Sequence, residues 1–431
     1  MKFTRYSKFL ALVFVATSLL TLGAARAEEL SYDRYASILR KEPEPSTAKE
    51  IAKNFLTYPL ELLRWPIDKT LNYVDKHRLL KKGQWLYEEG VDYGFTPRFD
   101  GMDYDFVRIT RQKVRFPDLV AKAWTDYTYN AYVGAGGRIG AERIAETPIR
   151  FFETMNYSYR PREHFYGIGP DTSAGEGVTF KEEETFLESD LGYSRDPSFA
   201  LDFKFAYRDI NIENGRDGGV GNFDDHFPTL PSHGGDKLLT YGLEWVRDTR
   251  NQQENSTHGS RVQLASSFND GLNASDAQYF KYAVDASKYF PLWSERRILV
   301  LHFYGEHNSE TSHSSVPFHQ MARLGGYGSF PDLSRTLRGY EQNRFFDDSS
   351  MVLNAEYRYA IYQHRDAQLD TILFWDEGQV FGHFGEMQFQ DFRGTFGMGF
   401  RFSYLNHHIL TVEMAHGAEG TNFYVKSRTP F

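Results

Sequence analysis

Arg338, Glu356 and Asp376 are the residues whose types and spacing predict a specific polar site in this chain. Arg338 lies within Leu337-Arg338-Gly339-Tyr340, where the glycine allows the backbone to turn tightly. The planar guanidinium of an arginine can donate to both oxygens of one carboxylate, which suits it to this contact better than lysine. We therefore predict that Arg338 binds the two carboxylates and holds its own segment in place, which is positioning and not catalysis.

The two carboxylates occur in stretches where apolar and polar side chains alternate. Over residues 350–361 the odd-numbered positions are apolar or aromatic, and Glu356 is among the even-numbered polar ones. Over residues 369–380, Asp376 and Gly378 lie opposite the apolar face. Successive side chains of a strand point to opposite faces, so we expect both carboxylates on the inner face of a barrel.

Arg338 itself belongs to residues 309–349, a long segment with glycines at 325, 326, 328 and 339. A connection of this length is usually functional or disordered. We expect it to fold into the barrel lumen and form a contact, here called the loop lock, made of Arg338, Gly339, Tyr340, Glu356, Asp376 and Gly378. Alternation alone leaves a second interpretation open, in which each charged side chain has an ordinary local partner in a polar lumen.

The alternation that places these residues extends over most of the chain. From about Gly90 onward, fifteen stretches of about ten residues or more alternate in this way, and another is possible near 104–114. Strands of this length suit a tilted membrane crossing better than a soluble sandwich, whose strands average nearer six residues. Short and long connections are mixed and aromatic residues are dense, as in outer-membrane barrels. We predict an all-β transmembrane barrel of about sixteen antiparallel strands over residues 91–431.

The carboxyl end predicts the closing strand of that barrel. Phe423, Val425 and Phe431 share one parity over residues 421–431, which ends in an aromatic residue. Ser427, Thr429 and Pro430 weaken the alternation, so the signal is modest.

The amino end differs from the rest. Residues 1–27 combine early basic residues, an apolar stretch and Ala25-Arg26-Ala27, which predicts a secretory signal peptide. Residues 28–90 predict a short helical periplasmic extension, in which Ile67, Leu71 and Val74 form an apolar stripe. Basic residues flank this stripe, namely Lys69, Lys76, Arg78, Lys81 and Lys82. The segment is expected either to pack on neighbouring protein or to act as an interfacial or plug-like helix beside anionic lipid.

Composition excludes several classes of protein. After residue 27 no window approaches 18 consecutive apolar residues, so a helical transporter is excluded. The chain has no cysteine, which excludes disulfides, zinc ribbons and thiol nucleophiles. The formal net charge of −9 argues against a nucleic-acid partner, because a duplex binder needs a basic face.

Other chemistries are poorly supported, so we expect no enzyme activity, metal or cofactor. Residues 134–140 are rich in glycine but lack dinucleotide-binding spacing, and we interpret them as a turn between strands. The histidines at 302, 307, 313 and 319 lack the spacing of metal ligands. A lipase would need a serine–histidine pair on a lipid-facing wall, and His313-Ser314 in a loop does not supply one.

Three motifs together resemble the BamA/TamA superfamily, also called the bacterial surface antigen family. They are Leu337-Arg338-Gly339-Tyr340, Asn354-Ala355-Glu356-Tyr357-Arg358 and Phe374-Trp375-Asp376-Glu377-Gly378. Two further segments look like a turn and a strand pair of that family, namely 165–170 and 245–250 with His258-Gly259. The resemblance covers roughly residues 90–431 and implies a sixteen-stranded barrel whose loop arginine contacts strand carboxylates.

The same resemblance implies a function and a location. Members of the family aid insertion or translocation of proteins at the bacterial outer membrane, which would make outer-membrane lipids and unfolded outer-membrane or exported proteins the partners. Residues 28–90 are too short for the periplasmic POTRA modules that usually receive the client, so a separate periplasmic receptor is expected. The alternative is a passive channel or structural surface antigen without assembly activity.

Overall fold

The structure is a computed structural model, and the ranges it describes begin at the first predicted strand. They are residues 95–100, 103–109, 119–127, 131–145, 147–216, 221–272, 275–312, 314–327, 334–364, 367–404, 407–426 and 431. The predicted signal peptide and helical extension lie outside the described residues.

Sixteen strands of the described residues form one sheet, and two short strands form another. The large sheet contains β1 (Phe95–Asp100), β2 (Asp103–Ile109), β3 (Leu119–Tyr127), β4 (Val133–Ala141), β5 (Ile149–Phe165), β6 (Val178–Asp196), β7 (Phe199–Asn214), β8 (Lys237–Asp248), β9 (Gly259–Gly271), β10 (Gln278–Leu292), β11 (Ser294–Glu310), β14 (Ser349–His364), β15 (Ala367–Phe381), β16 (Arg393–Tyr404), β17 (His407–Gly417) and β18 (Gly420–Lys426). The small sheet pairs β12 (Ala322–Leu324) with β13 (Phe345–Asp347). Short helical segments are η1 (Ala174–Glu176), α5 (Phe223–His226), η2 (Phe318–Gln320), η3 (Phe384–Glu386) and η4 (Phe389–Asp391).

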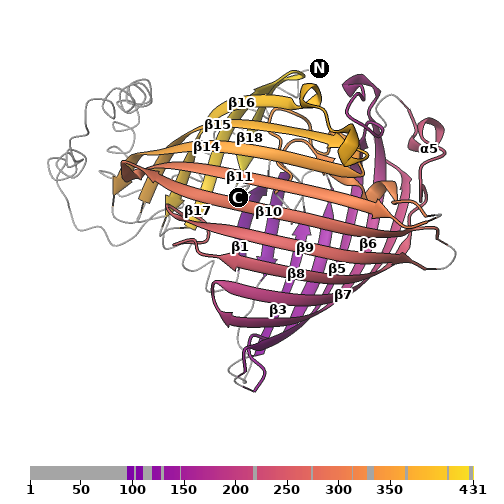
Figure 1. Cartoon of the computed structure of the whole chain (residues 1–431), viewed down its shortest axis with the longest axis horizontal. Helices are drawn as coiled ribbons and strands as arrows, with labels where there is room; N and C mark the ends of the chain where they lie inside the picture. Colours follow the sequence, from indigo (N-terminus) through magenta and orange to yellow (C-terminus); the bar gives the residue numbers. More distant parts are fainter. Residues whose placement is uncertain are drawn as a thin grey trace.

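Consecutive strands of the large sheet pair antiparallel, apart from β2 and β3, for which the described residues show no ladder, and β11, which pairs with β14 across the long loop. β1 also pairs antiparallel with β18. The order around the sheet is β2-β1-β18-β17-β16-β15-β14-β11-β10-β9-β8-β7-β6-β5-β4-β3. β2 and β3, at the two ends of this order, lie against each other, so the sheet curves into a closed barrel (Figure 1). The prediction of an all-β barrel with about sixteen antiparallel strands is confirmed.

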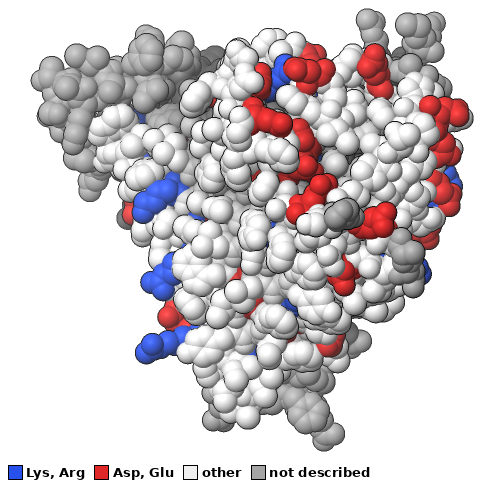
Figure 2. Space-filling view, turned by 45° about the vertical axis from the view of Figure 1, so that its right-hand side comes forward, with Lys and Arg blue, Asp and Glu red and all other residues white. Residues whose placement is uncertain are grey.

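The two ends of the barrel differ in the lengths of their connections. At one end the connections are only two residues long, such as 197–198, 365–366 and 405–406. At the other end the connections include 215–236 and 311–348. Outer-membrane barrels place short turns in the periplasm and long loops outside the cell, which orients the molecule. Figure 2 shows acidic side chains gathered toward the end with the long connections, where Asp171 and Asp224 have largely exposed side chains.

The barrel wall is apolar outside and polar inside. On β7, Leu201, Phe203 and Phe205 are exposed on the outer face, whereas Asp202 is buried on the inner one. This is the reverse of a soluble sandwich and is what a wall in contact with lipid requires. Among the described residues, no helix is long and apolar enough to cross a membrane.

The glycine-rich segment 134–140 is not a turn, as we predicted, but forms most of β4. The reason is close packing on the inner face. A Cβ on Gly136 would lie 2.5 Å from the ring of Trp124, whose Nε1 donates to Asn156 Oδ1 at 3.1 Å. The indole crosses β4 to reach β5, and only a strand without side chains at that position leaves room for it.

Phe431, which we predicted in the closing strand, is separated from β18 (Gly420–Lys426) by residues 427–430, which lie outside the described residues. The Phe431 ring stacks on His302 with 4.7 Å between ring centroids. It packs against Val300 and its neighbours on the inner face of β10 and β11. Burial of the ring against apolar side chains there is favourable.

Candidate functional site

The long loop between β11 and β14 carries the site into the lumen. β12 and β13 pair from Ala322 with Asp347 to Leu324 with Phe345, which forms a narrow base. Beyond that base the Leu337 N–H donates to the Gly326 carbonyl at 3.0 Å. Leu324, Leu337 and Phe345 pack in one buried cluster with inward-facing residues of β11, β14 and β15. Apolar packing therefore fixes the loop on both sides of Arg338.

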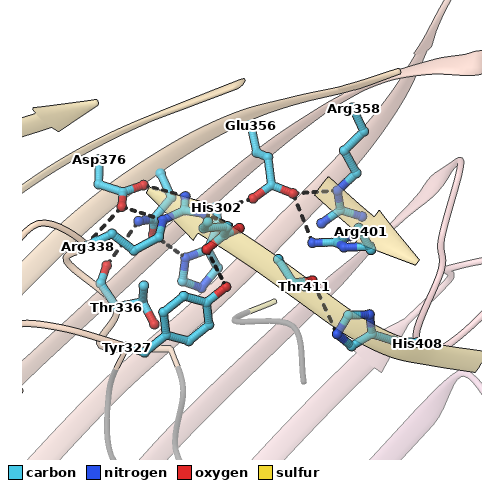
Figure 3. Close-up of polar contacts among 12 residues, drawn as sticks. His302, Tyr327, Thr336, Arg338, Glu356, Arg358, Asp376, Arg401, His408 and Thr411 are labelled. Carbon is cyan, nitrogen blue, oxygen red and sulfur yellow. Dashed lines mark hydrogen bonds and ion pairs between the residues drawn. The ribbon is translucent and has the colours of Figure 1, made fainter. Parts of the chain in front are cut away.

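Arg338 lies at the centre of a buried ionic cluster (Figure 3). Its Nε and Nη2 donate to the two oxygens of Asp376, each at 2.7 Å. Its Nη1 donates to Glu356 at 3.1 Å and to Glu413 at 3.2 Å. All four side chains have 0% exposure, and the guanidinium also lies 3.4 Å from the ring centre of Phe374. One cation thus bridges three strands, β14, β15 and β17.

Two further arginines complete the charge balance of this cluster. Arg358 Nε donates to Glu356 at 2.6 Å, and Arg401 Nη2 donates to the same carboxylate oxygen at 3.1 Å. Three arginines therefore face the three carboxylates of Glu356, Asp376 and Glu413. A buried ion pair adds little net stability, but loss of one partner leaves an uncompensated charge. The cluster is suited to fixing one position of the loop.

The glycines of the loop lock allow close approach between loop and wall. Gly339 has φ +91°, and its N–H donates to the hydroxyl of Tyr424 at 2.9 Å. That hydroxyl in turn donates to the Tyr340 carbonyl at 3.2 Å. A Cβ on Gly378 would lie 2.8 Å from the Met351 carbonyl oxygen. Through Tyr424 the last strand, β18, contacts the loop directly.

A second ionic contact holds the loop to the neighbouring part of the wall. Arg335 Nη2 lies 2.7 Å from Glu306 Oε2, and Lys281 Nζ lies 3.0 Å from Oε1 of the same carboxylate. Ser334 Oγ donates to Asp285 Oδ2 at 2.5 Å. These contacts reach β10 and β11, which follow β14 in the sheet, so polar contacts bind the loop along a continuous part of the wall from β10 to β17.

The turn at residues 165–170 also contacts the loop. The Gly169 N–H donates to the Phe346 carbonyl at 2.8 Å, and Gly167 and Gly169 both have φ near +100°. The rings of Phe165 and Phe346 meet edge to face at 5.0 Å. They belong to a larger aromatic core, with Phe318 among its members, that packs over the lumen at the end with the long connections.

The segment 245–250 with His258-Gly259 forms the turn between β8 and β9. Arg250 donates twice to Asp248, with Nη2 at 2.7 Å and Nε at 3.0 Å. Gly259 has φ +101°, and a Cβ there would lie 2.2 Å from the Thr249 carbonyl oxygen. This motif therefore stabilises a turn at the periplasmic end and is remote from the loop.

The structure brings together Arg338, Gly339, Tyr340, Glu356, Asp376 and Gly378 and leaves the predicted closing residues apart from them. Phe423 is 71% exposed on the outer face of β18, and Phe431 lies in the lumen. Within the described part of the chain, no group of three or more His, Asp or Glu side chains is arranged to hold a metal ion. That the loop lock fixes the loop stays a prediction.

Sequence reasoning missed three wall residues that contact the loop, Glu413, Tyr424 and Glu306, and the loop residue Arg335 that binds Glu306. Glu413 alternates with the outward Val412 and Met414, so its parity was a usable signal. Glu306 has the same parity as His302 on β11, which faces inward. Tyr424 is one of many aromatic residues, and Arg335 lies in a loop without periodicity. The sequence therefore did not indicate the contact that either residue makes.

At the outer end of the loop, the half-buried Asp348 lies beside other acids. Burial, then Glu310 and Asp347, raise the pKa of Asp348 to about 6, while His383 acts in the opposite direction. Asp348 follows β13 and precedes β14, at the end with the long connections. Its charged form is disfavoured in the folded barrel.

Comparison with known proteins places the chain among related barrels. Residues 133–404 match the family model of the Omp85 superfamily domain. BamA from Haemophilus ducreyi lacking POTRA domains 1–3 is similar in structure, with a TM-score of 0.53 and 11% identity over 76% of this chain and 69% of that one. CdiB from Escherichia coli gives 0.49 and 9% identity over 76% and 61% of the two chains. No curated protein sequence matched the chain.

Replacing Arg338 with alanine should destabilise the barrel by roughly 3 to 5 kcal/mol, because three buried carboxylates lose a cation that they share. Heat-dependent mobility on gels should show a lower unfolding temperature, and protease should cut residues 311–348 faster. Lys237→Ala is the control: Lys237 and Asp209 are 2.8 Å apart but both are exposed, so little change is expected. An Arg338→Ala barrel as stable and protease-resistant as the native one would refute the loop lock.

Replacing Asp348 with asparagine should stabilise the barrel at pH 8 and have no effect near pH 4. The pKa in the folded state, about 6, lies above the unfolded value of about 3.9. The contribution of Asp348 to the stability of the folded barrel is therefore fully present below pH 4 and is lost as the pH rises through 6. Asparagine avoids this loss, which is roughly 1 kcal/mol after solvent screening. Unfolding temperatures at the two pH values test this, with the exposed Asp171→Asn as control. Equal shifts at both pH values would contradict it.

Proposed function

Because the chain belongs to the Omp85 superfamily, we propose that it aids the insertion or translocation of proteins at the bacterial outer membrane, where the barrel lies. The proposed partners are outer-membrane lipids and unfolded outer-membrane or exported proteins. Delivery by a separate periplasmic receptor is part of the proposal. The working element is the seam between the first and last strands, and the loop lock positions it.

The weak pairing at that seam is the observation that carries the proposal. Within the described residues, β1 and β18 share one paired position, Asp100 with Lys426. On its other side β18 pairs with β17 over seven positions, from Thr411 with Lys426 to Gly417 with Gly420. A strand edge with few partners is a template for another strand, so an incoming strand can pair with β18.

The contents of the lumen favour a role at the wall over a role as a pore. The ionic cluster around Arg338, the contact of Arg335 with Glu306 and the aromatic core near Phe318 occupy successive levels of the lumen. Such packing hinders the passage of solutes. Tyr424 joins the loop to β18, so the seated loop supports the strand that lies at the seam.

Conductance in a planar bilayer separates this function from that of a passive channel. The purified native barrel should be nearly silent, because the loop and its partners fill the lumen. Deletion of residues 311–348 should produce steady conductance. Deletion of the exposed turn residues 384–391 is a control of the same extracellular end and should leave the barrel silent. A large steady conductance in the native protein would favour the passive channel instead.

Photocrosslinking from the seam tests contact with clients. A photoreactive residue in place of Phe423 on β18 should form adducts with newly made outer-membrane or exported proteins in growing cells. The same residue in place of Leu243 on β8 is the control, because that side chain is 49% exposed on a well-paired part of the wall. Adducts at both positions, or at neither, would count against insertion at the seam.

A further inference from the structure

The outer wall of β14 to β17 is buried at its periplasmic end, although this face should meet lipid. Toward the extracellular end the outward side chains are open, with Leu353 48%, Trp375 52% and Phe396 63% exposed. Toward the short turns the outward Tyr359 is 2% exposed and Leu410 is 7% exposed. On the same outer face, the exposure of the side chains therefore falls from the extracellular end to the periplasmic end.

An arginine in the same area is buried as well. Arg297 pairs with Tyr359 in the ladder of β11 and β14, so it has outward parity, and its guanidinium lies 4.5 Å from the ring centre of Tyr359. Its exposure is 1%. The side chains beside a residue in one flat wall cannot cover its outer face, so a cover above the wall is needed.

Other described parts of the outer wall are exposed at this end. At the same end, the outward Tyr193 on β6 is 41% exposed, Leu201 on β7 is 39% exposed and Phe290 on β10 is 38% exposed. These side chains are as close to short turns as Tyr359 and Leu410 are. The curvature of the barrel and the length of its strands therefore do not explain the difference.

The segment that precedes β1 can supply the cover over the outer wall of β14 to β17. β1 is antiparallel to β18, and Asp100 at its end pairs with Lys426, so Phe95 begins at the periplasmic end beside β18. A segment tethered to Phe95 can therefore reach the covered wall. Within the predicted helical extension that precedes β1, residues 66–82 hold the apolar stripe of Ile67, Leu71 and Val74 and the basic residues that flank it.

The dimensions of this helix fit the covered wall. Seventeen helical residues are about 26 Å long. Four spacings between adjacent strands, from β11 to β17, are about 19 Å when measured across the strands and more along a tilted path. A helix of this length can lie across the whole covered area, with basic side chains level with the phosphate groups of the inner leaflet.

We propose that residues 66–82 dock on the outer wall of β14 to β17 at its periplasmic end. Ile67, Leu71 and Val74 pack on the face that Tyr359 and Leu410 form. The lysines and arginine beside the stripe bind anionic lipid headgroups. The docked helix covers Arg297, which would otherwise face the membrane boundary.

Disulfide formation tests the docking directly, because the chain has no cysteine of its own. Cysteines at 67, 71 or 74 are combined with Leu410→Cys, and in the control set with Leu201→Cys. Both wall positions are leucines on outward faces near short turns, but one is 7% and the other 39% exposed. In oxidised outer membranes, intramolecular disulfides should form in at least one Leu410→Cys pair and in no Leu201→Cys pair. Their absence from both sets, or presence in both, would overturn the proposal.

Labelling of single cysteines remains informative if a double variant folds poorly. A lipid-soluble maleimide should label Leu410→Cys at least several-fold more slowly than Leu201→Cys in the full chain, with heat-dependent gel mobility as the folding check. Deletion of residues 66–82 should raise labelling of Leu410→Cys to the level of Leu201→Cys. Equal labelling in the full chain would show that lipid covers the wall, and a disulfide-linked dimer of Leu410→Cys would assign the cover to a second copy. Either result would overturn the proposal.

Discussion

The enclosed charges of the lumen are the constraint on which the rest of this barrel depends. A barrel with a lipid-facing outer wall must place its polar side chains inside, and a filled interior offers them little water. Charges that lose water must find partners of opposite sign. Arg338 meets this need for Asp376, Glu356 and Glu413 together, and Arg358 and Arg401 complete the balance. The register of β14, β15 and β17 and the close approach allowed by Gly339 and Gly378 make that neutralisation possible.

Most of the fold and of the site that could be predicted from the sequence follows from the alternation of apolar and polar residues in the strands. It gives the number of strands, the orientation of the wall and the inward positions of Glu356 and Asp376, because a period of two admits only two faces. Glu413 obeys the same rule and could have been found by applying it to β17. Arg335 and Tyr424 could not, since the position of a loop side chain follows from three-dimensional packing and not from a local period.

Two segments show where the local sequence pattern does not predict the structure. A run of glycines reads as a turn when only backbone freedom is considered, yet in β4 it gives room to Trp124 from the neighbouring strand. Phe431 has the parity of a closing strand, yet its ring stacks on His302 inside the lumen. In both cases a large side chain elsewhere in the sequence decides the outcome, and a window of ten residues does not include it.

The partners of Arg338 also couple the loop to the completeness of the wall. Asp376, Glu413 and Tyr424 belong to β15, β17 and β18, which all follow the loop in the chain. The loop therefore has its full set of partners only when the last strands of the sheet are in place. A wall without β17 or β18 would leave the loop without Glu413 or without the Tyr424 hydroxyl, so the seated loop is a marker of a finished barrel.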